Sequence, residues 1–160
     1  MVRDSLTHLG SGESSYRYDS PSRDIMDVFS SPRPGRDFVI ALECMEFTSL
    51  CPITGQPDYG EIDVVYVPDQ LCIESKSLKL YLGAYRNHGA FHEDCVNSIL
   101  DDIVAVCAPV FIRVIGDFNA RGGIAIKPVA VNWGEDIDEN RRGDVMEIVR
   151  SYDRFSRSKR

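Results

Sequence analysis

The segment from residue 92 to residue 107 (HEDCVNSILDDIVAVC) limits the possible folds more than any other part of the chain. Its apolar side chains recur at helical spacing: Val96, Ile99, Leu100, Ile103 and Cys107. This spacing predicts an amphipathic helix with one apolar face, and Pro109 ends it because proline cannot continue a helix. Such a helix must pack on a second layer, which the flanking sequence has to supply.

Strand-like runs stand on both sides of the helical part of the chain. Residues 38–47 (FVIALECMEF) are rich in β-forming side chains, and residues 61–67 (EIDVVYV) place Ile62, Val64 and Tyr66 on one face. After the helix, residues 110–118 and 122–133 predict a hairpin joined through residues 119–121. The sequence therefore predicts two strands before the helices and two strands after them.

A second amphipathic helix is predicted within residues 76–86 (KSLKLYLGAYR). Its apolar side chains have i, i+3, i+4, i+7 spacing: Leu78, Tyr81, Leu82 and Tyr85. We expect Ser75 or Ser77 to cap its N-terminus. The order strand, strand, helix, helix, strand, strand predicts an α+β layer, in which a four-stranded antiparallel sheet carries two helices on one face.

The length and composition predict a single folded core with two polar extensions. A chain of 160 residues suits one domain, which we place at residues 36–134. Residues 1–35 are rich in Ser, Asp, Pro and Arg and predict a partly flexible arm with one short packed segment. Residues 135–160 predict a charged tail or a short docking helix, whose apolar side chains would be Val145, Met146, Ile148 and Val149.

Several classes of protein are disfavoured by composition. The five cysteines form no CxxC pair and the N-terminus is polar, so we expect a reduced, cytoplasmic protein. No apolar run approaches the 18 or so residues that a membrane span needs. The net charge of −7 repels phosphate backbones, which argues against nucleic-acid binding but leaves a nucleotide-sized ligand open.

The stretch SLCPITGQPDY (residues 49–59) places Cys51 in a Pro/Gly turn with Asp58 seven residues later. Most free cysteines are buried as small apolar residues, whereas a thiol in such a turn would be exposed and reactive. On the local sequence alone, the favoured interpretation is that Cys51 is an ordinary turn residue and Asp58 a solvated loop acid.

Three stretches together carry a resemblance to a known family: EFTSLCPITGQPDYG, ESKSLKLYLGAYRNHGAFHEDC and ARGGIAI. They resemble the short, single-domain form of the QueF nitrile reductases, the NADPH-dependent 7-cyano-7-deazaguanine reductases of queuosine biosynthesis. The similarity runs from about residue 38 to about residue 133, and the signature ESKSLKLY is intact at residues 74–81. The resemblance implies the tunnelling fold, with the order ββααββ, for the catalytic domain at residues 36–134.

The resemblance also implies a reaction and its residues. The nitrile 7-cyano-7-deazaguanine would be reduced to 7-aminomethyl-7-deazaguanine by two hydride transfers, through a covalent thioimidate on Cys51. Asp58 would carry the thiol proton to the nitrile nitrogen, and His92, which we expect to face the pocket, would orient the substrate or relay protons. Glu93 would accept hydrogen bonds from N1–H and the exocyclic amine of the base.

Other residues are assigned to ligands with alternatives open. Glu74 and Ser75, from the signature, would complete the substrate site, whereas Glu93 could simply complement the helix dipole. Lys76, Lys79 and Arg121 would hold the phosphates of NADPH, with the adjacent glycines allowing close approach; the alternative for the two lysines is a solvated helix face. The sequence has no GxGxxG motif, and we expect no metal.

Assembly, redox chemistry and rival functions remain as expectations. The uncovered sheet face and edges require closure, and the resemblance implies a homo-oligomer, a decamer of two pentamers whose sheets close into a barrel with active sites between subunits. Cys95 is either a core residue or a thiol that forms a reversible bond with Cys51. The rivals are a GTP cyclohydrolase-like zinc enzyme, for which the Cys and His spacing is unsuitable, and a silent nucleotide-binding or assembly module.

Overall fold

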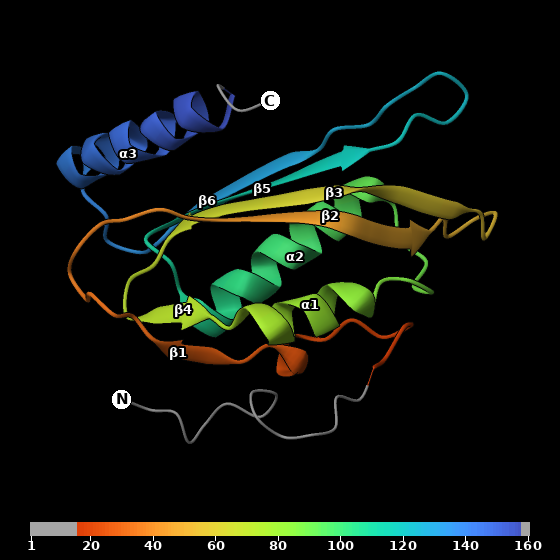
Figure 1. Cartoon of the computed structure of the whole chain (residues 1–160), viewed down its shortest axis with the longest axis horizontal. Helices are drawn as coiled ribbons and strands as arrows, with labels where there is room; N and C mark the ends of the chain where they lie inside the picture. Colours follow the sequence, from red (N-terminus) through yellow and green to blue (C-terminus); the bar gives the residue numbers. More distant parts are fainter. Residues whose placement is uncertain (1–15, 158–160) are drawn as a thin grey trace.

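A four-stranded antiparallel sheet forms the centre of the molecule in the computed structural model, which describes residues 16–157 (Figure 1). The strand order is β2-β3-β5-β6, and the strands are β2 (Ile40–Leu50), β3 (Pro57–Val67), β5 (Phe111–Phe118) and β6 (Val129–Trp133). Two helices, α1 (Ser75–Gly83) and α2 (His92–Cys107), lie on one face. A third helix, α3 (Glu139–Arg157), lies on the other face. The predicted α+β class and antiparallel sheet are confirmed.

The alternation of side chains along β3 builds a core on each face of the sheet. Ile62, Val64 and Tyr66 are fully buried and pack with the apolar stripe of α2, as their spacing predicts. Val65 and Val67 point the other way and pack with residues of α3. Both faces of β3 are therefore apolar because helices cover both of them.

Three predicted strands have clearly different bounds in the structure. The strand expected at residues 61–67 already begins at Pro57. The strand expected at residues 38–47 runs from Ile40 to Leu50, and the one expected at residues 122–133 begins only at Val129. Residues 122–128 lie outside it because Gly122 and Gly123 have φ values of 59° and 83° and form a tight turn. Arg121 and Ile124 exchange backbone hydrogen bonds of 3.0 and 3.1 Å across this turn.

The N-cap of α1 is Glu74 rather than Ser75 or Ser77. The Glu74 carboxylate accepts hydrogen bonds of 2.8 Å from the backbone N–H groups of Lys76 and Ser77, which satisfies two of the unpaired donors of the first turn. The Ser77 hydroxyl accepts from the backbone N–H of Asp27 at 2.8 Å. Ser77 is therefore a buried anchor between the helix and the preceding arm.

The described part of the N-terminal arm packs against the core. A single helical turn, η1 (Arg23–Ile25), is followed by β1 (Val28–Ser30), which pairs antiparallel with β4 (Leu71–Ile73) in a small separate sheet. The first 15 residues of the predicted arm lie outside the described residues. The short packed segment predicted within the arm corresponds to this turn and strand.

The charged C-terminal segment forms a helix of 19 residues, which is longer than the short helix that the sequence indicates. Val145 and Val149 are fully buried against the sheet, and the Arg113 guanidinium donates two hydrogen bonds of 3.1 and 2.7 Å to the carboxylate of Asp153. The sheet face that we expected to be uncovered is therefore partly covered within a single chain. Among residues 16–157, no helix has the length and apolar character that crossing a membrane requires.

Candidate active site

The loop that carries Cys51 is closed by its own backbone hydrogen bonds. Cys51 lies directly after β2, its N–H donates to the carbonyl of Gln56 at 2.9 Å, and its carbonyl accepts from the N–H of Gly55, also at 2.9 Å. Gly55 has a φ of 67°, a conformation that favours glycine. These bonds fix the backbone on both sides of the thiol.

A second segment holds this loop against the start of α2. Leu50 donates its N–H to the carbonyl of His88 at 2.9 Å and accepts from the N–H of Ala90 at 3.0 Å. Gly89 lies so close to the loop that an added Cβ would meet the Cα of Pro52 at 3.3 Å. The chain then enters α2 at His92, so the loop of Cys51 and the first turn of α2 are held together.

The environment of Cys51 favours its thiolate. The pKa of this thiol is lowered from 9.0 to about 7, first by a hydrogen bond from the Thr54 hydroxyl, then by the backbone N–H groups of Thr54 and Ile53, and also by the Arg121 guanidinium. Each of these donors stabilises the negative sulfur more than the neutral thiol. A cysteine with such a pKa is a much better nucleophile near neutral pH than an ordinary one.

Asp58 is a buried carboxylate between two basic side chains. Its Oδ1 lies 2.9 Å from Nη1 of Arg121 and 3.3 Å from Nε2 of His92, and the side chain is only 3% exposed. Asp58 lies opposite Ser49 in the pairing of β2 with β3, and Ser49 precedes Cys51 by two residues. The basic partners compensate the cost of burying the charge.

His92 is buried rather than exposed to a pocket, which corrects our expectation for a histidine at a helix start. Its ring stacks on Phe118, with the ring centroids 3.9 Å apart and the planes 9° from parallel. Nε2 is directed toward Asp58 at 3.3 Å, although this buried nitrogen makes no well-directed hydrogen bond. The structure thus places His92 and Asp58 together, as the proposed proton chemistry requires.

The remaining predicted ligand residues are distributed over more than one place. Glu93 is exposed in the first turn of α2, while Glu74 is buried and caps α1. Ser75 and Lys79 line a pocket of about 560 Å³ between α1, β2 and the N-terminal arm, whereas Lys76 does not line it. Arg121, in contrast, is engaged with Asp58.

Cys95 belongs to the apolar core between the sheet and α2. It is fully buried, and burial raises its pKa to about 11, although the nearby Ser49 hydroxyl opposes this rise. No disulfide joins the five cysteines, all of which lie within the described residues. Ser49, which contacts Cys95, is only two residues before Cys51 in the chain. The reversible bond between Cys51 and Cys95 stays a prediction.

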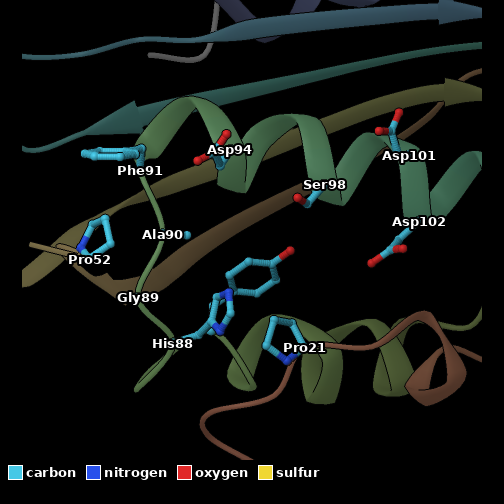
Figure 2. A pocket seen from close by; sticks show the side chains of 11 residues that line it. Pro21, Pro52, His88, Gly89, Ala90, Phe91, Asp94, Ser98, Asp101 and Asp102 are labelled. Atoms are coloured by element: carbon cyan, nitrogen blue, oxygen red, sulfur yellow. The ribbon is translucent and has the colours of Figure 1, made fainter.

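A second pocket of about 560 Å³ lies on the other side of the Cys51 loop (Figure 2). Pro52 and Phe91, the neighbours of Cys51 and His92, line it together with His88 and with Asp94, Asp101 and Asp102 of α2. Neither of the two pockets is lined by Cys51, Asp58, His92 or Glu93. Within residues 16–157, no three His, Cys, Asp or Glu side chains are grouped as metal ligands would be.

Sequence reasoning missed two residues of this site. Thr54 gives the hydroxyl that does most to lower the pKa of Cys51, and Phe118 forms the surface on which His92 stacks. A hydroxyl three residues after a turn cysteine was a usable signal for Thr54. Phe118 had no local signal, because its contact with His92 joins β5 to α2.

Comparisons with known proteins identify the family to which the chain is similar. The family described as QueF-like protein matches residues 57–136. A reductase of Helicobacter pylori (strain G27), named NADPH-dependent 7-cyano-7-deazaguanine reductase, is 56% identical over 113 residues, which cover 71% of this chain and 74% of that protein. A protein of the same name from Streptococcus thermophilus (strain CNRZ 1066) is 52% identical over 129 residues, covering 81% and 78%.

One solved structure is similar in fold. The crystal structure of the archaeosine synthase QueF-Like in the apo form has a TM-score of 0.56 and 24% sequence identity, covering 60% of this chain and 94% of that one. At this identity the likeness concerns the fold alone.

Proposed function

The chain belongs to the QueF-like family, and we propose that it is an NADPH-dependent reductase of the nitrile 7-cyano-7-deazaguanine in queuosine biosynthesis. The product would be 7-aminomethyl-7-deazaguanine. The observation that carries the proposal is the Cys51 thiol, whose pKa of about 7 makes it a nucleophile at neutral pH, beside the Asp58 and His92 pair. The names of the relatives supply the substrate class.

The proposed first step is the addition of Cys51 to the nitrile. The sulfur forms a bond to the nitrile carbon, one C–N π bond breaks, and the nitrogen takes up a proton to give a thioimidate. Asp58 is the proposed proton carrier, because its carboxylate lies beside the Cys51 loop and contacts both Arg121 and His92. His92, stacked on Phe118, would keep this carboxylate oriented.

Charged side chains in or near α1 and α2 supply the proposed contacts with the substrate and the cofactor. Glu93, exposed beside His92, would accept hydrogen bonds from N1–H and the exocyclic amine of the base. Lys79 and Arg86 line one pocket, and such cations fit the phosphates of NADPH. With Lys76 they would hold this cofactor, which supplies the hydride for both reductions when it is bound.

We also propose that a second copy of the chain completes the active site. The assembly would work in the cytoplasm. Cys51 and Glu93 line neither of the two pockets described above, so a substrate held by both would need further walls. A neighbouring copy in a closed ring, such as a decamer of two pentamers, would provide them and would cover the free edges of the sheet.

The decisive experiment is the intact mass of the protein after mixing with 7-cyano-7-deazaguanine without NADPH. We expect an adduct of one substrate mass on the wild type and no adduct on Cys51→Ala. Asp58→Asn should form the adduct much more slowly, because an amide cannot carry the proton. A wild type that binds the nitrile but never gains its mass would contradict covalent catalysis and favour a binding module.

A further inference from the structure

Arg121 contacts both residues that carry the proposed chemistry. Its Nη1 lies 2.9 Å from Oδ1 of Asp58, and its guanidinium also donates a hydrogen bond to the sulfur of Cys51. Arg121 lies in the loop between β5 and β6, far along the chain from both Cys51 and Asp58. It therefore links the Cys51 loop, the start of β3 and the β5–β6 loop.

The backbone around Arg121 is built to present this side chain. Arg121 starts the tight turn formed by Gly122 and Gly123, and Asn119 donates its N–H to the carbonyl of Tyr59, the neighbour of Asp58, at 2.9 Å. An added Cβ at either glycine would meet no atom within 4 Å, so the glycines serve the turn and not a close contact within the chain. The Arg121 side chain is still 37% exposed and can adjust.

We propose that Arg121 is a positioning residue for Cys51 and Asp58 and acts on this pair before any cofactor is bound. This inference rests on the proposed function, since it concerns the same reaction. A guanidinium is planar and has several donors, so one side chain can bind a carboxylate and a sulfur at once. Its positive charge stabilises the thiolate, and its bond to Asp58 holds the proton carrier next to the nucleophile.

The sequence suggests a different role, in which Arg121 only binds the phosphates of NADPH. The two roles give opposite expectations for a protein without cofactor. If Arg121 serves NADPH alone, its removal leaves the thiol unchanged until NADPH is added. If Arg121 positions Cys51 and Asp58, its removal changes the reactivity of the thiol in the cofactor-free protein.

The test is the rate of alkylation of Cys51 by iodoacetamide as a function of pH, without NADPH, followed by peptide mass. In the wild type the rate should rise with a midpoint at pH about 7. In Arg121→Gln we expect the midpoint about half a unit higher and the rate at pH 7 about twofold lower, because the thiolate fraction falls from about half to about a quarter. This loss is smaller than the one expected for Thr54, because Arg121 contributes least among the donors that lower this pKa. Arg121→Lys should restore part of the loss.

Lys127→Gln is the matched control, because it removes one positive charge from the same loop and Lys127 pairs with the exposed Asp117. It should keep the wild-type profile. An unchanged pH profile in Arg121→Gln would overturn the proposal. If circular dichroism shows that Arg121→Gln is unfolded, the Arg121→Ala variant is measured in its place. Failure of the wild type to form the nitrile adduct would instead refute the proposed function and leave the thiol profile intact.

Discussion

At Cys51, hydrogen-bond donors rather than burial determine the reactivity of the thiol. Burial raises its pKa slightly, but the Thr54 hydroxyl, two backbone N–H groups and Arg121 lower it to about 7. The four other cysteines show the opposite balance, since burial raises the pKa of Cys72, that of Cys44 and Cys95 to about 11, and that of Cys107 to about 12. The loop therefore singles out Cys51 for alkylation near neutral pH.

Thr54→Val should raise the pKa of Cys51, because the largest of the stabilising hydrogen bonds is lost while the others remain. A higher pKa means less thiolate at pH 7, so we expect alkylation there to slow by about threefold to fivefold, with little change at pH 9. Thr48→Val, which alters a threonine of β2 outside the loop, is the control. Equal slowing at all pH values would show that the loop was distorted instead.

Glu93→Gln should weaken the binding of 7-cyano-7-deazaguanine by about 2 kcal/mol, or about thirtyfold, the loss typical of a charge-assisted hydrogen bond. Calorimetry on a Cys51→Ala background would measure this without the covalent step. Asp94→Asn is the matched control, because Asp94 lies in the same first turn of α2 and complements the same helix dipole. An equal loss in both variants would reduce Glu93 to a dipole role.

The residues of the site could be predicted from the sequence where one short stretch carries the chemistry. Cys51 and Asp58 lie in one short stretch, at the end of β2 and the start of β3, and the structure brings Asp58 together with His92. The contacts of Arg121 with Asp58 and of His92 with Phe118 could not be predicted, because they depend on the register of β3 with β5 and on the position of α2 above it.

Among the elements, β5 is fitted to α2 by a missing side chain. A Cβ added at Gly116 would lie 2.6 Å from Cε2 of Phe118 and 2.8 Å from Cγ2 of Val96. The Phe118 ring cannot simply move away, because it stacks on His92 and packs edge-on against Phe47. Gly116 therefore makes room for the ring that orients His92.

Gly116→Ala should lower the free energy of unfolding by about 1–3 kcal/mol through overpacking, measured by urea denaturation. Gly143→Ala is the opposite control, since Gly143 lies on the exposed side of α3 with no atom near an added Cβ. It should stabilise the protein by about 0.5–1 kcal/mol, because alanine favours a helix more than glycine does. A Gly116→Ala protein as stable as the wild type would mean that the ring has room to shift.

Periodicity predicted the elements well where one face is apolar and poorly where local chemistry or charge dominates. The helix at residues 92–107 has the predicted bounds, since its stripe and Pro109 define both ends. The predicted N-cap residue of α1 was wrong, because a glutamate side chain can reach the same backbone N–H groups as a serine side chain. The length of α3 was underestimated, because ion pairs such as Asp153 of α3 with Arg113 of β5 hold charged residues onto the sheet.

For the whole molecule, β2 and β6 are the outer strands of the four-stranded sheet, and α3 covers only part of one face. Within residues 16–157 no further strand pairs along their outer edges, although Leu50 at the end of β2 bonds to the segment around Gly89. Val129 and Val131 of β6 are 58% and 52% exposed, and Met45 of β2 is 67% exposed. Apolar side chains along open edges favour pairing with another chain. They support the proposed closed ring, in which β6 of one copy would meet β2 of the next.

Val131→Asp should therefore break the assembly, because it places a charge where the ring would bury an apolar side chain. We expect sedimentation velocity to show the wild type as one large species and Val131→Asp as smaller ones, with nitrile adduct formation reduced in parallel, since the site would lose its second wall. Val131→Thr keeps the shape without the charge and should still assemble at high concentration. A wild type that sediments as a monomer, or a Val131→Asp protein that assembles as the wild type does, would exclude β6 from the interface and would leave Cys51 and Glu93 to form the substrate site within one chain.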